Sequence, residues 1–221
     1  MIIAVDAAGG DHYPKNPILG ALEAIEEFDN LTVLLVGPEK LVQSELSQHH
    51  HEQSRIQILD APQVVDMTDS ASLALKQKPN SSIAKGITLH KKGHCHGFVS
   101  AGNTGVLLAA SMFILGKLEG RSRPTIATYY PSLEGFRLII DAGANLDIKP
   151  EMALQFALMG QVYAKEIMGI EQPRVGLLNV GEEEGKGTEL LKEIYEMLKQ
   201  LPSFIGNVEG GGPNATNGGN N

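Results

Sequence analysis

The 221-residue sequence contains no tryptophan, and aromatic residues make up only 5% of it. Its core must therefore be built from aliphatic side chains, for which a hydrophobic content of 42% is ample. A single cysteine, Cys95, excludes an internal disulfide framework and favours a reducing compartment. Basic residues are also in the minority, because 18 Lys and Arg stand against 26 Asp and Glu. The formal charge of −8 argues against nucleic-acid binding, which needs a basic surface.

Long hydrophobic segments are missing as well. The longest apolar stretch, residues 106–115, is too short to span a bilayer. The N-terminus passes directly into a strand pattern at residues 2–5, without the basic and apolar regions of a secretory signal peptide. We therefore expect no leader and no spanning helix, and we expect a cytoplasmic location.

Apolar runs that are typical of buried strands alternate with helical patterns along the chain. The strand patterns cover residues 2–5, 31–36, 55–59, 97–100, 125–130, 137–140, 174–178 and 204–205. The helical patterns cover residues 17–28, 104–118, 150–168 and 188–201. This alternation predicts an α/β fold, a three-layer α/β/α sandwich with a mostly parallel, Rossmann-like sheet. We expect one such domain over residues 1–209, and a disordered Gly/Asn-rich tail over residues 210–221.

Five of the strand patterns end in a loop of small and polar residues. These loops are residues 6–12, 100–105, 141–147, 179–187 and 206–210. Because the carboxyl ends of parallel strands share one edge of a sheet, we expect the loops to form one composite site. Small residues let backbone N–H groups approach an anion, and a following helix adds the positive end of its dipole. The pattern favours an oxygen-rich anion such as phosphate.

The first loop combines a glycine turn with titratable side chains. Gly9 and Gly10 permit a tight turn, and Asp6 is expected to fix the loop by accepting backbone N–H bonds. His12 could orient phosphate or share a proton with it, since histidine changes charge near neutral pH. Asp11 is interpreted equally well as a site residue or as a helix N-cap.

The second loop is the strongest candidate for phosphate binding. Ser100 and Thr104 could donate hydrogen bonds through hydroxyls and Asn103 through its amide, with Gly102 allowing close approach. The alternative is an ordinary Asn/Thr helix cap with glycine turns.

The third loop carries two carboxylates around Gly143 and Asn145. Paired carboxylates could hold a divalent metal, but bare carboxylates repel phosphate. We expect a structural role for Asp141, and a site-lining role for Asn145 and Asp147. Lys149 could offset the charge near a bound anion, or it could be a solvated lysine at a helix start.

The fourth loop follows the strand end with Asn179 and Gly181, which are further candidates for binding. Its acidic run, residues 182–184, is more typical of a solvated surface than of a catalytic base. The order of glycines before Lys186 does not match a nucleotide-binding P-loop. The segment around Cys95, with a histidine on either side, lacks companion ligands elsewhere and does not predict a metal site.

Four of these segments together resemble the PlsX family of bacterial phosphate acyltransferases, which act in phospholipid synthesis. They are residues 5–12, 100–105, 141–150 and 176–183, and the resemblance covers roughly residues 1–210. Two positions depart from the usual pattern, since the family has Met at Ala8 and Val at Ala142. Family members are also longer, which implies that the domain lacks the family's C-terminal part.

The resemblance implies a sandwich related to isocitrate and isopropylmalate dehydrogenases and to phosphotransacetylases. It implies transfer of a fatty acyl group from acyl carrier protein to inorganic phosphate, with no cofactor. It also implies a homodimer and peripheral contact with a membrane. On this basis we assign catalytic roles to His12, Asn103 and Lys149 and expect direct attack by phosphate, without a covalent acyl-enzyme.

Two other functions stay open. One is a shortened chain that binds ligand or partner without turnover. The other is a dinucleotide-dependent dehydrogenase, although the Gly-x-Gly-x-x-Gly fingerprint is absent from the first strand. An acidic carrier protein would need a local basic patch on this acidic chain. The candidates are Lys76 with Lys78, Lys91 with Lys92, and Lys117 with Arg121 and Arg123.

Overall fold

In the computed structural model, the structure describes residues 1–120, 123–132, 135–145 and 147–210. The chain divides into two compact units, residues 1–119 and residues 120 onward, and each is described by itself. The single domain over residues 1–209 stays a prediction. The predicted disordered tail lies outside the described residues, except for Gly210.

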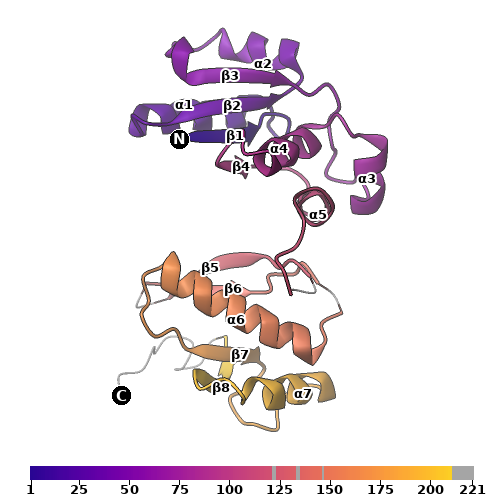
Figure 1. The fold of residues 1–221 in the computed structure, drawn as a ribbon, viewed down its shortest axis with the longest axis vertical. Coiled ribbons are helices and arrows are strands. Elements are labelled where there is room, and N and C mark those ends of the chain that lie inside the picture. The colour runs from indigo at the N-terminus through magenta and orange to yellow at the C-terminus, as the bar shows by residue number, and fades with distance from the viewer. Residues whose placement is uncertain (121–122, 133–134, 146, 211–221) are drawn as a thin grey trace. The chain divides into compact units, whose positions relative to one another are not determined.

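The first unit is built on a parallel sheet of four strands in the order β3-β2-β1-β4 (Figure 1). The strands are β1 Ile2–Asp6, β2 Thr32–Gly37, β3 Ile56–Asp60 and β4 Gly97–Val99. Each one lies within one residue of its predicted position at both ends. Every pairing is parallel, as expected for apolar strands separated by helices.

Helices cover both faces of this sheet, which confirms the layered arrangement within the unit. Helices α1 Lys15–Glu27 and α2 Glu39–Leu46 pack on one face, against Val33 and Leu35. Leu34 and Val36 point the other way, because successive strand residues alternate between faces. They pack with Leu89 of helix α4, Ser82–Lys91.

A second apolar cluster lies where three helices meet in the first unit. It joins α4 to α3 Ala71–Gln77 and α5 Thr104–Ala110, and Val106 and Ala110 are fully buried in it. The predicted helix over residues 104–118 begins at Thr104 as expected. It continues as a π-helical turn, Ser111–Leu115, and ends at Gly116, where φ is +103°.

Three short helices, α2, α3 and α4, are not predicted by the apolar patterns. In α4 the cause is local, because Gly86 and β-branched residues occupy its centre and both lower helix propensity. Tertiary packing and a cap stabilise it instead. The Ser81 side chain accepts the Ala84 N–H at 3.4 Å, and Gly86 lies directly against the Phe98 ring. The 3-10 turn Gln53–Arg55 follows three consecutive histidines, residues 49–51.

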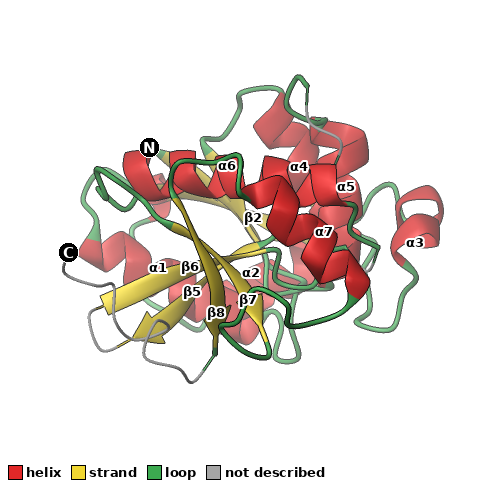
Figure 2. Cartoon of the chain, turned by 90° about the horizontal axis from the view of Figure 1, so that it is seen from below, coloured by secondary structure: helices red, strands yellow, loops and turns green. Residues whose placement is uncertain are grey.

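The described residues of the second unit form two small sheets and two helices. Strands β5 Ala127–Ser132 and β6 Gly135–Ile140 are antiparallel, whereas β7 Val175–Asn179 and β8 Phe204–Glu209 are parallel. Helices α6 Pro150–Glu166 and α7 Glu189–Leu198 pack against each other (Figure 2). Pro150 opens α6, and the Thr188 hydroxyl caps α7 by accepting the Leu191 N–H at 3.3 Å.

One loop prediction is wrong. Residues 206–210 were expected to form the fifth loop, but β8 runs through them as far as Glu209. Asn207 and Val208 pair with Leu177 and Leu178 of β7, and the irregularity needed to pass Gly206 is a register shift in that ladder. The polar residues that suggest a loop are therefore strand residues. None of the described helices is both long and apolar enough to cross a membrane.

The contact between Gly86 and Phe98 predicts the effect of a matched pair of substitutions. In Gly86→Ala the new methyl would lie 2.1 Å from Phe98 Cε2, so we expect a loss of about 1–3 kcal/mol of unfolding free energy. Gly20→Ala adds a methyl where no atom lies within 4 Å, in the exposed middle of α1, and should stabilise by about 0.5–1 kcal/mol. Chemical denaturation of both variants tests the packing, and equal effects would contradict it.

Candidate active site

The order of strands in the first unit places two of the predicted loops side by side. Strand β1 lies between β2 and β4, and Val5 is aligned with Val99 at their carboxyl ends. The chain leaves β1 toward β2 and later returns to the other side of β1 as β4. This is a topological switch point, where parallel α/β sheets bind their ligands. The loops that begin at Asp6 and Ser100 therefore meet there.

A buried carboxylate joins these two loops. Asp6 is 2% exposed, and its Oδ1 accepts the Ala8 N–H at 3.0 Å, which is the contact expected for it. Its Oδ2 accepts the Ser100 hydroxyl at 2.7 Å, and Ser100 Oγ in turn accepts the Gly102 N–H at 3.0 Å. The Ser100 proton is committed to Asp6. Ser100 therefore holds the loop, rather than donating to an anion as its predicted role requires.

The glycines of the two loops allow this contact. A Cβ on Gly9 would lie 2.5 Å from Asp6 Oδ2 and 2.9 Å from the Gly102 nitrogen. Gly102 is nearly as crowded, because its Cβ would lie 3.2 Å from both Asp6 Oδ2 and Ser100 Oγ. Gly10 has a φ of +88°, which L side chains rarely adopt. The small residues thus bring the two loop backbones into contact.

The side chain of Asn103 caps helix α5, which is the alternative to phosphate binding considered for this loop. Its Oδ1 accepts the Val106 N–H at 3.0 Å, and its Nδ2 donates to the carbonyls of Asp66, Met67 and Asp69 at 3.0–3.1 Å. The side chain is 8% exposed. Its amide is fully used by these contacts, so the geometry does not support the predicted direct donation to phosphate.

The donors of the second loop that remain without a partner in the described part of the chain are backbone N–H groups. The first N–H groups of any helix lack intrahelical acceptors. Among the described residues, no acceptor is found for the N–H groups of Asn103, Thr104 and Gly105. The exposed Thr104 hydroxyl lies at the same helix start. These groups form a ready site for an anion.

The titratable side chains of the first loop are exposed beside it. Asp11 and His12 lie just before α1, and neither side chain hydrogen-bonds to another described residue. The N-cap position of α1 is Pro14, which provides no side-chain cap, so Asp11 is not the N-cap that the alternative required. His12 is therefore available to a ligand at this edge of the sheet.

A third segment, residues 61–70, also reaches this edge and was missed from the sequence. It follows β3, and Asn103 holds it by the three carbonyls named above. Its Asp66 and Asp69 side chains both pair with Lys78, at 3.1 and 2.5 Å. The Lys78 hydrogen bond lowers the pKa of Asp69, and the Asp69 hydrogen bond raises the pKa of Lys78. The Asp/Thr/Ser-rich sequence after a strand pattern is the signal that could have identified this segment.

In the second unit, Asp141 closes the third loop. Its carboxylate accepts four hydrogen bonds from described residues, given by the Thr125 hydroxyl, the Ile126 N–H, and the backbone and side-chain amides of Asn145. Partial burial alone would raise the pKa of Asp141, but these bonds outweigh it and lower the pKa. Asp141 has its expected structural role. The Asn145 amide also donates to the Pro124 carbonyl at 3.1 Å, so it closes the loop instead of lining a site.

The other predicted residues of this loop differ in their surroundings. Gly143 has a φ of +84° and open space around it. Asp147 and Lys149 are exposed, and Lys149 stands at the N-cap position of α6 without capping it through its side chain. Their roles as site residues stay predictions.

The fourth loop is closed by two asparagines. Asn179 Nδ2 donates to the Lys186 carbonyl at 3.0 Å and to Asn207 Oδ1 at 3.1 Å, while Asn207 Nδ2 donates to the Glu183 carbonyl at 2.8 Å. A Cβ on Gly187 would lie 2.8 Å from Asn179 Oδ1. Gly181 is buried in the same loop. The Asn179 amide is thus used within the protein. Asn207, which the sequence placed in the fifth loop, lies in β8 and helps to close the fourth loop.

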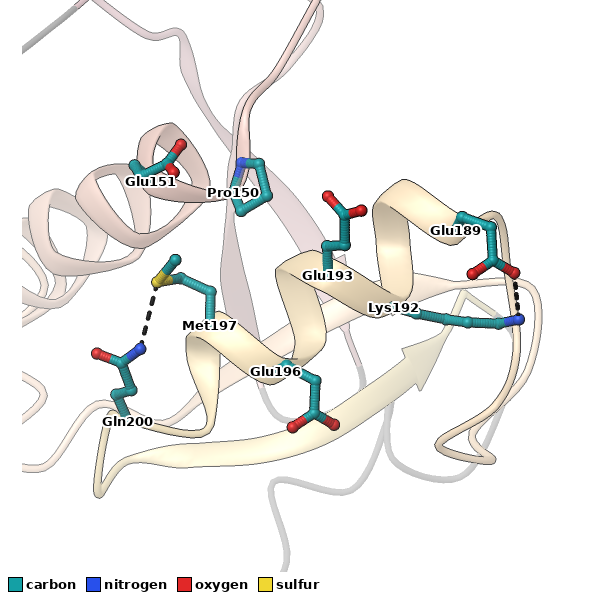
Figure 3. Close-up of a pocket in the computed structure, with 8 residues that line it drawn as sticks. All are labelled: Pro150, Glu151, Glu189, Lys192, Glu193, Glu196, Met197 and Gln200. Atoms are coloured by element: carbon teal, nitrogen blue, oxygen red, sulfur yellow. Dashed lines mark hydrogen bonds and ion pairs between the residues drawn. The ribbon is translucent and has the colours of Figure 1, made fainter.

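A groove of about 550 Å³ lies along α7 and the start of α6, but it does not match the predicted site (Figure 3). The residues lining it are Pro150, Glu151, Glu189, Lys192, Glu193, Glu196, Met197 and Gln200. Lys192 pairs with Glu189 at 2.7 Å, so carboxylates dominate the lining. Such a surface repels phosphate.

No group of three His, Cys, Asp or Glu side chains within the described part of the chain is placed to hold a metal ion. Cys95 is 3% exposed, and burial raises the pKa of its thiol. His96 precedes β4 and contacts the backbone of Ile2, at the amino edge of the sheet. This segment therefore lies away from the carboxyl edge of the sheet.

The Asp6–Ser100 contact can be measured with a double-mutant cycle. Asp6→Ala and Ser100→Ala should be non-additive by about 1–3 kcal/mol, because each removes the same charge-assisted hydrogen bond. Ser100→Ala combined with Gln43→Ala, on the remote helix α2, serves as the control and should be additive. The unfolding free energies of the variants are measured by denaturant titration. Additive effects of Asp6→Ala and Ser100→Ala would contradict the hydrogen bond between the two side chains.

The lowered pKa of Asp141 predicts a pH dependence of stability. Because its pKa is lower in the folded chain, its carboxylate stabilises the fold at pH values above the unfolded pKa of about 3.9. That contribution is lost as the pH falls through the lower, folded pKa. Asp141→Asn should be less stable than the wild type at neutral pH, and the difference should shrink below about pH 4. A constant difference across this range would contradict the assignment.

Solved structures resemble the fold at low sequence identity. A phosphotransacetylase from Streptococcus pyogenes aligns with a TM-score of 0.69 and 15% identity, over 95% of this chain and 68% of its own. The EutD phosphotransacetylase from Staphylococcus aureus gives 0.64 and 16%, over 90% of this chain and 64% of its own. These likenesses confirm the predicted α/β fold class.

Curated relatives are much more similar in sequence. The phosphate acyltransferase of Salinibacter ruber is 48% identical over 213 residues, which are 95% of this chain and 63% of the relative. That of Halothermothrix orenii is 44% identical over 95% of this chain and 64% of its own length. The chain thus spans less than two thirds of the length of these relatives. A family described as fatty acid synthesis protein matches residues 1–217. The resemblance seen in the four motifs is confirmed, and the chain belongs to this family.

Proposed function

We propose that this chain takes part in the transfer of a fatty acyl group from acyl carrier protein to inorganic phosphate, giving acyl phosphate for phospholipid synthesis. One observation carries the proposal. Two loops at the switch point of a parallel sheet are locked together by Asp6 and Ser100, and they leave backbone amides and His12 available. The names of the relatives support the same activity.

The reaction suits a site made of backbone donors. An oxygen of inorganic phosphate attacks the thioester carbonyl carbon, the new C–O bond forms, and the C–S bond breaks as the carrier thiolate leaves. Thiolates leave readily, so positioning of phosphate and stabilisation of the oxyanion matter more than a strong general acid. The free N–H groups at the start of α5 hold the phosphate, and the imidazole of His12 takes up the proton that phosphate releases.

The partners follow from the same proposal. Acyl carrier protein is acidic and needs basic side chains on this chain, and Lys76 and Lys92 are exposed. Asp66 and Asp69 offset the charge of Lys78, whereas Lys91, which donates to the Ile114 carbonyl, is exposed and keeps its positive charge. Arg121 lies outside the described residues. A cytoplasmic location, a homodimer and peripheral membrane contact are proposed from the family resemblance.

Substitution of His12 tests the site and the activity together. With hexadecanoyl acyl carrier protein and phosphate, the chain should release free carrier thiol and form acyl phosphate, which hydroxylamine traps as the hydroxamate. His12→Ala should lower kcat/KM about a hundredfold or more if the imidazole moves a proton. His50→Ala, in an exposed loop after α2, is the matched control and should leave the rate unchanged.

Three outcomes have distinct meanings. Phosphate-dependent thiol release that His12→Ala abolishes supports both the reaction and the site. Release that is insensitive to His12→Ala places the chemistry elsewhere in the chain. A wild-type chain without any release would refute turnover by these 221 residues.

A further inference from the structure

The segment that sequence reasoning missed, residues 61–70 and here called the strap, lies against the proposed anion site. It connects β3 to α3, and α3 packs on α5. Its carbonyls at Asp66, Met67 and Asp69 accept from Asn103 Nδ2 at 3.1, 3.0 and 3.1 Å. Three backbone carbonyls of the strap therefore accept hydrogen bonds from Asn103, the N-cap residue of α5.

The strap has a defined internal shape. The Asp69 N–H donates to the Asp66 carbonyl at 3.1 Å, and the Asp66 N–H donates to Asp69 Oδ2 at 2.8 Å. Lys78 pairs with both carboxylates and offsets their charge, which would otherwise weaken anion binding nearby. The strap is thus a folded element whose attachment to the site passes through Asn103.

The strap also presents an apolar side chain beside the polar site. Met67 is 56% exposed, although its carbonyl is hydrogen-bonded to the buried Asn103 amide. Two further apolar side chains are exposed on adjoining segments of the chain: Leu73 on α3, which follows the strap, is 51% exposed, and Val99, which precedes Ser100, is 57% exposed. A substrate with an acyl chain attached to a reacting carbonyl needs this combination of a polar centre and apolar surroundings. Methionine suits such a surface, because its flexible side chain adapts to chains of different shape.

We infer that the strap is the acyl-side wall of the site, that Met67 contacts the alkyl chain of the acyl thioester, and that Asn103 is the positioning residue that holds the strap in place. This inference rests on the proposed function for its substrate class. It gives the buried Asn103 amide a role that direct phosphate binding does not explain. It also separates the two functions of one side chain, since Oδ1 caps α5 while Nδ2 holds the strap.

The two functions of Asn103 can be separated by substitution. Asn103→Asp keeps an acceptor for the Val106 N–H but loses the donor and places negative charge against three carbonyls. Asn103→Ser keeps a good N-cap without that repulsion. Hydrogen exchange of the whole chain should show the Asp66 and Asp69 amides exchanging about tenfold faster in both variants, with α5 still protected. Unchanged exchange at Asp66 and Asp69, or loss of protection in α5 alone, would overturn the role of Asn103.

Photolabelling locates the acyl chain without requiring turnover. The probe is a hexadecanoyl thioester of pantetheine that carries a diazirine on its alkyl chain, and peptide mass spectrometry maps the adduct. We expect labelling within residues 61–70 at Met67, strongly reduced in Met67→Lys and in Asn103→Ser. Leu41→Lys, at an exposed apolar position on α2, is the matched control and should label like the wild type.

Labelling elsewhere, labelling unaffected by Met67→Lys, or no labelling at all would overturn the inference. The test also distinguishes it from the proposed function. A chain that is labelled on the strap but forms no acyl phosphate would count against turnover alone. A chain that forms acyl phosphate but is labelled outside the strap would count against the strap alone.

Discussion

The hydrogen bond from Ser100 to the buried Asp6 carboxylate is the contact on which the proposed site depends. It joins the ends of two strands that are 94 residues apart in the sequence. It also favours the glycines, because a side chain at position 9 would collide with the carboxylate and the facing loop, and one at position 102 would lie tightly against the carboxylate. Once Asp6 occupies the space between the loops, the N–H groups of Asn103, Thr104 and Gly105 have no acceptor among the described residues. A buried charge thus stabilises the loops, and the donors it does not use are left for function.

The asparagines of the loops show a common principle. Asn103, Asn145 and Asn179 were all predicted to face a ligand, yet Asn145 and Asn179 use their amides to close their own loops, and Asn103 uses its amide to hold the segment of residues 61–70. An amide that donates and accepts at once can satisfy several backbone groups of an irregular segment, which would otherwise be buried without partners. The polar residues that mark a functional loop in a sequence are therefore partly the residues that build it. What remains for an anion is the backbone of that loop and the exposed side chains beside it.

The sequence predicts the elements better than it predicts the contacts. Periodicity locates all eight strands that the described residues form, and the helices that carry long apolar faces, because burial imposes a regular spacing of apolar residues. It misses α4, whose glycine and β-branched residues are stabilised by packing on Phe98, and it misreads the end of β8, where Gly206 and Asn207 belong to a ladder. The pairing of Asp6 with Ser100 follows from the strand order β1-β4. No local pattern contains that order, although the four family motifs indicate which loops matter.

The strap illustrates why one class of site residue escapes such reasoning. Its sequence is rich in Asp, Thr and Ser but lacks the glycines of the other loops, and its place depends on Asn103, more than thirty residues away. A loop that binds an anion must expose donors, whereas a wall for an alkyl chain must expose apolar surface near them. The first requirement leaves a recognisable sequence of small residues. The second requirement is met in the sequence of the strap only by Met67, and its position beside the proposed site is known only from the hydrogen bond between its carbonyl and Asn103.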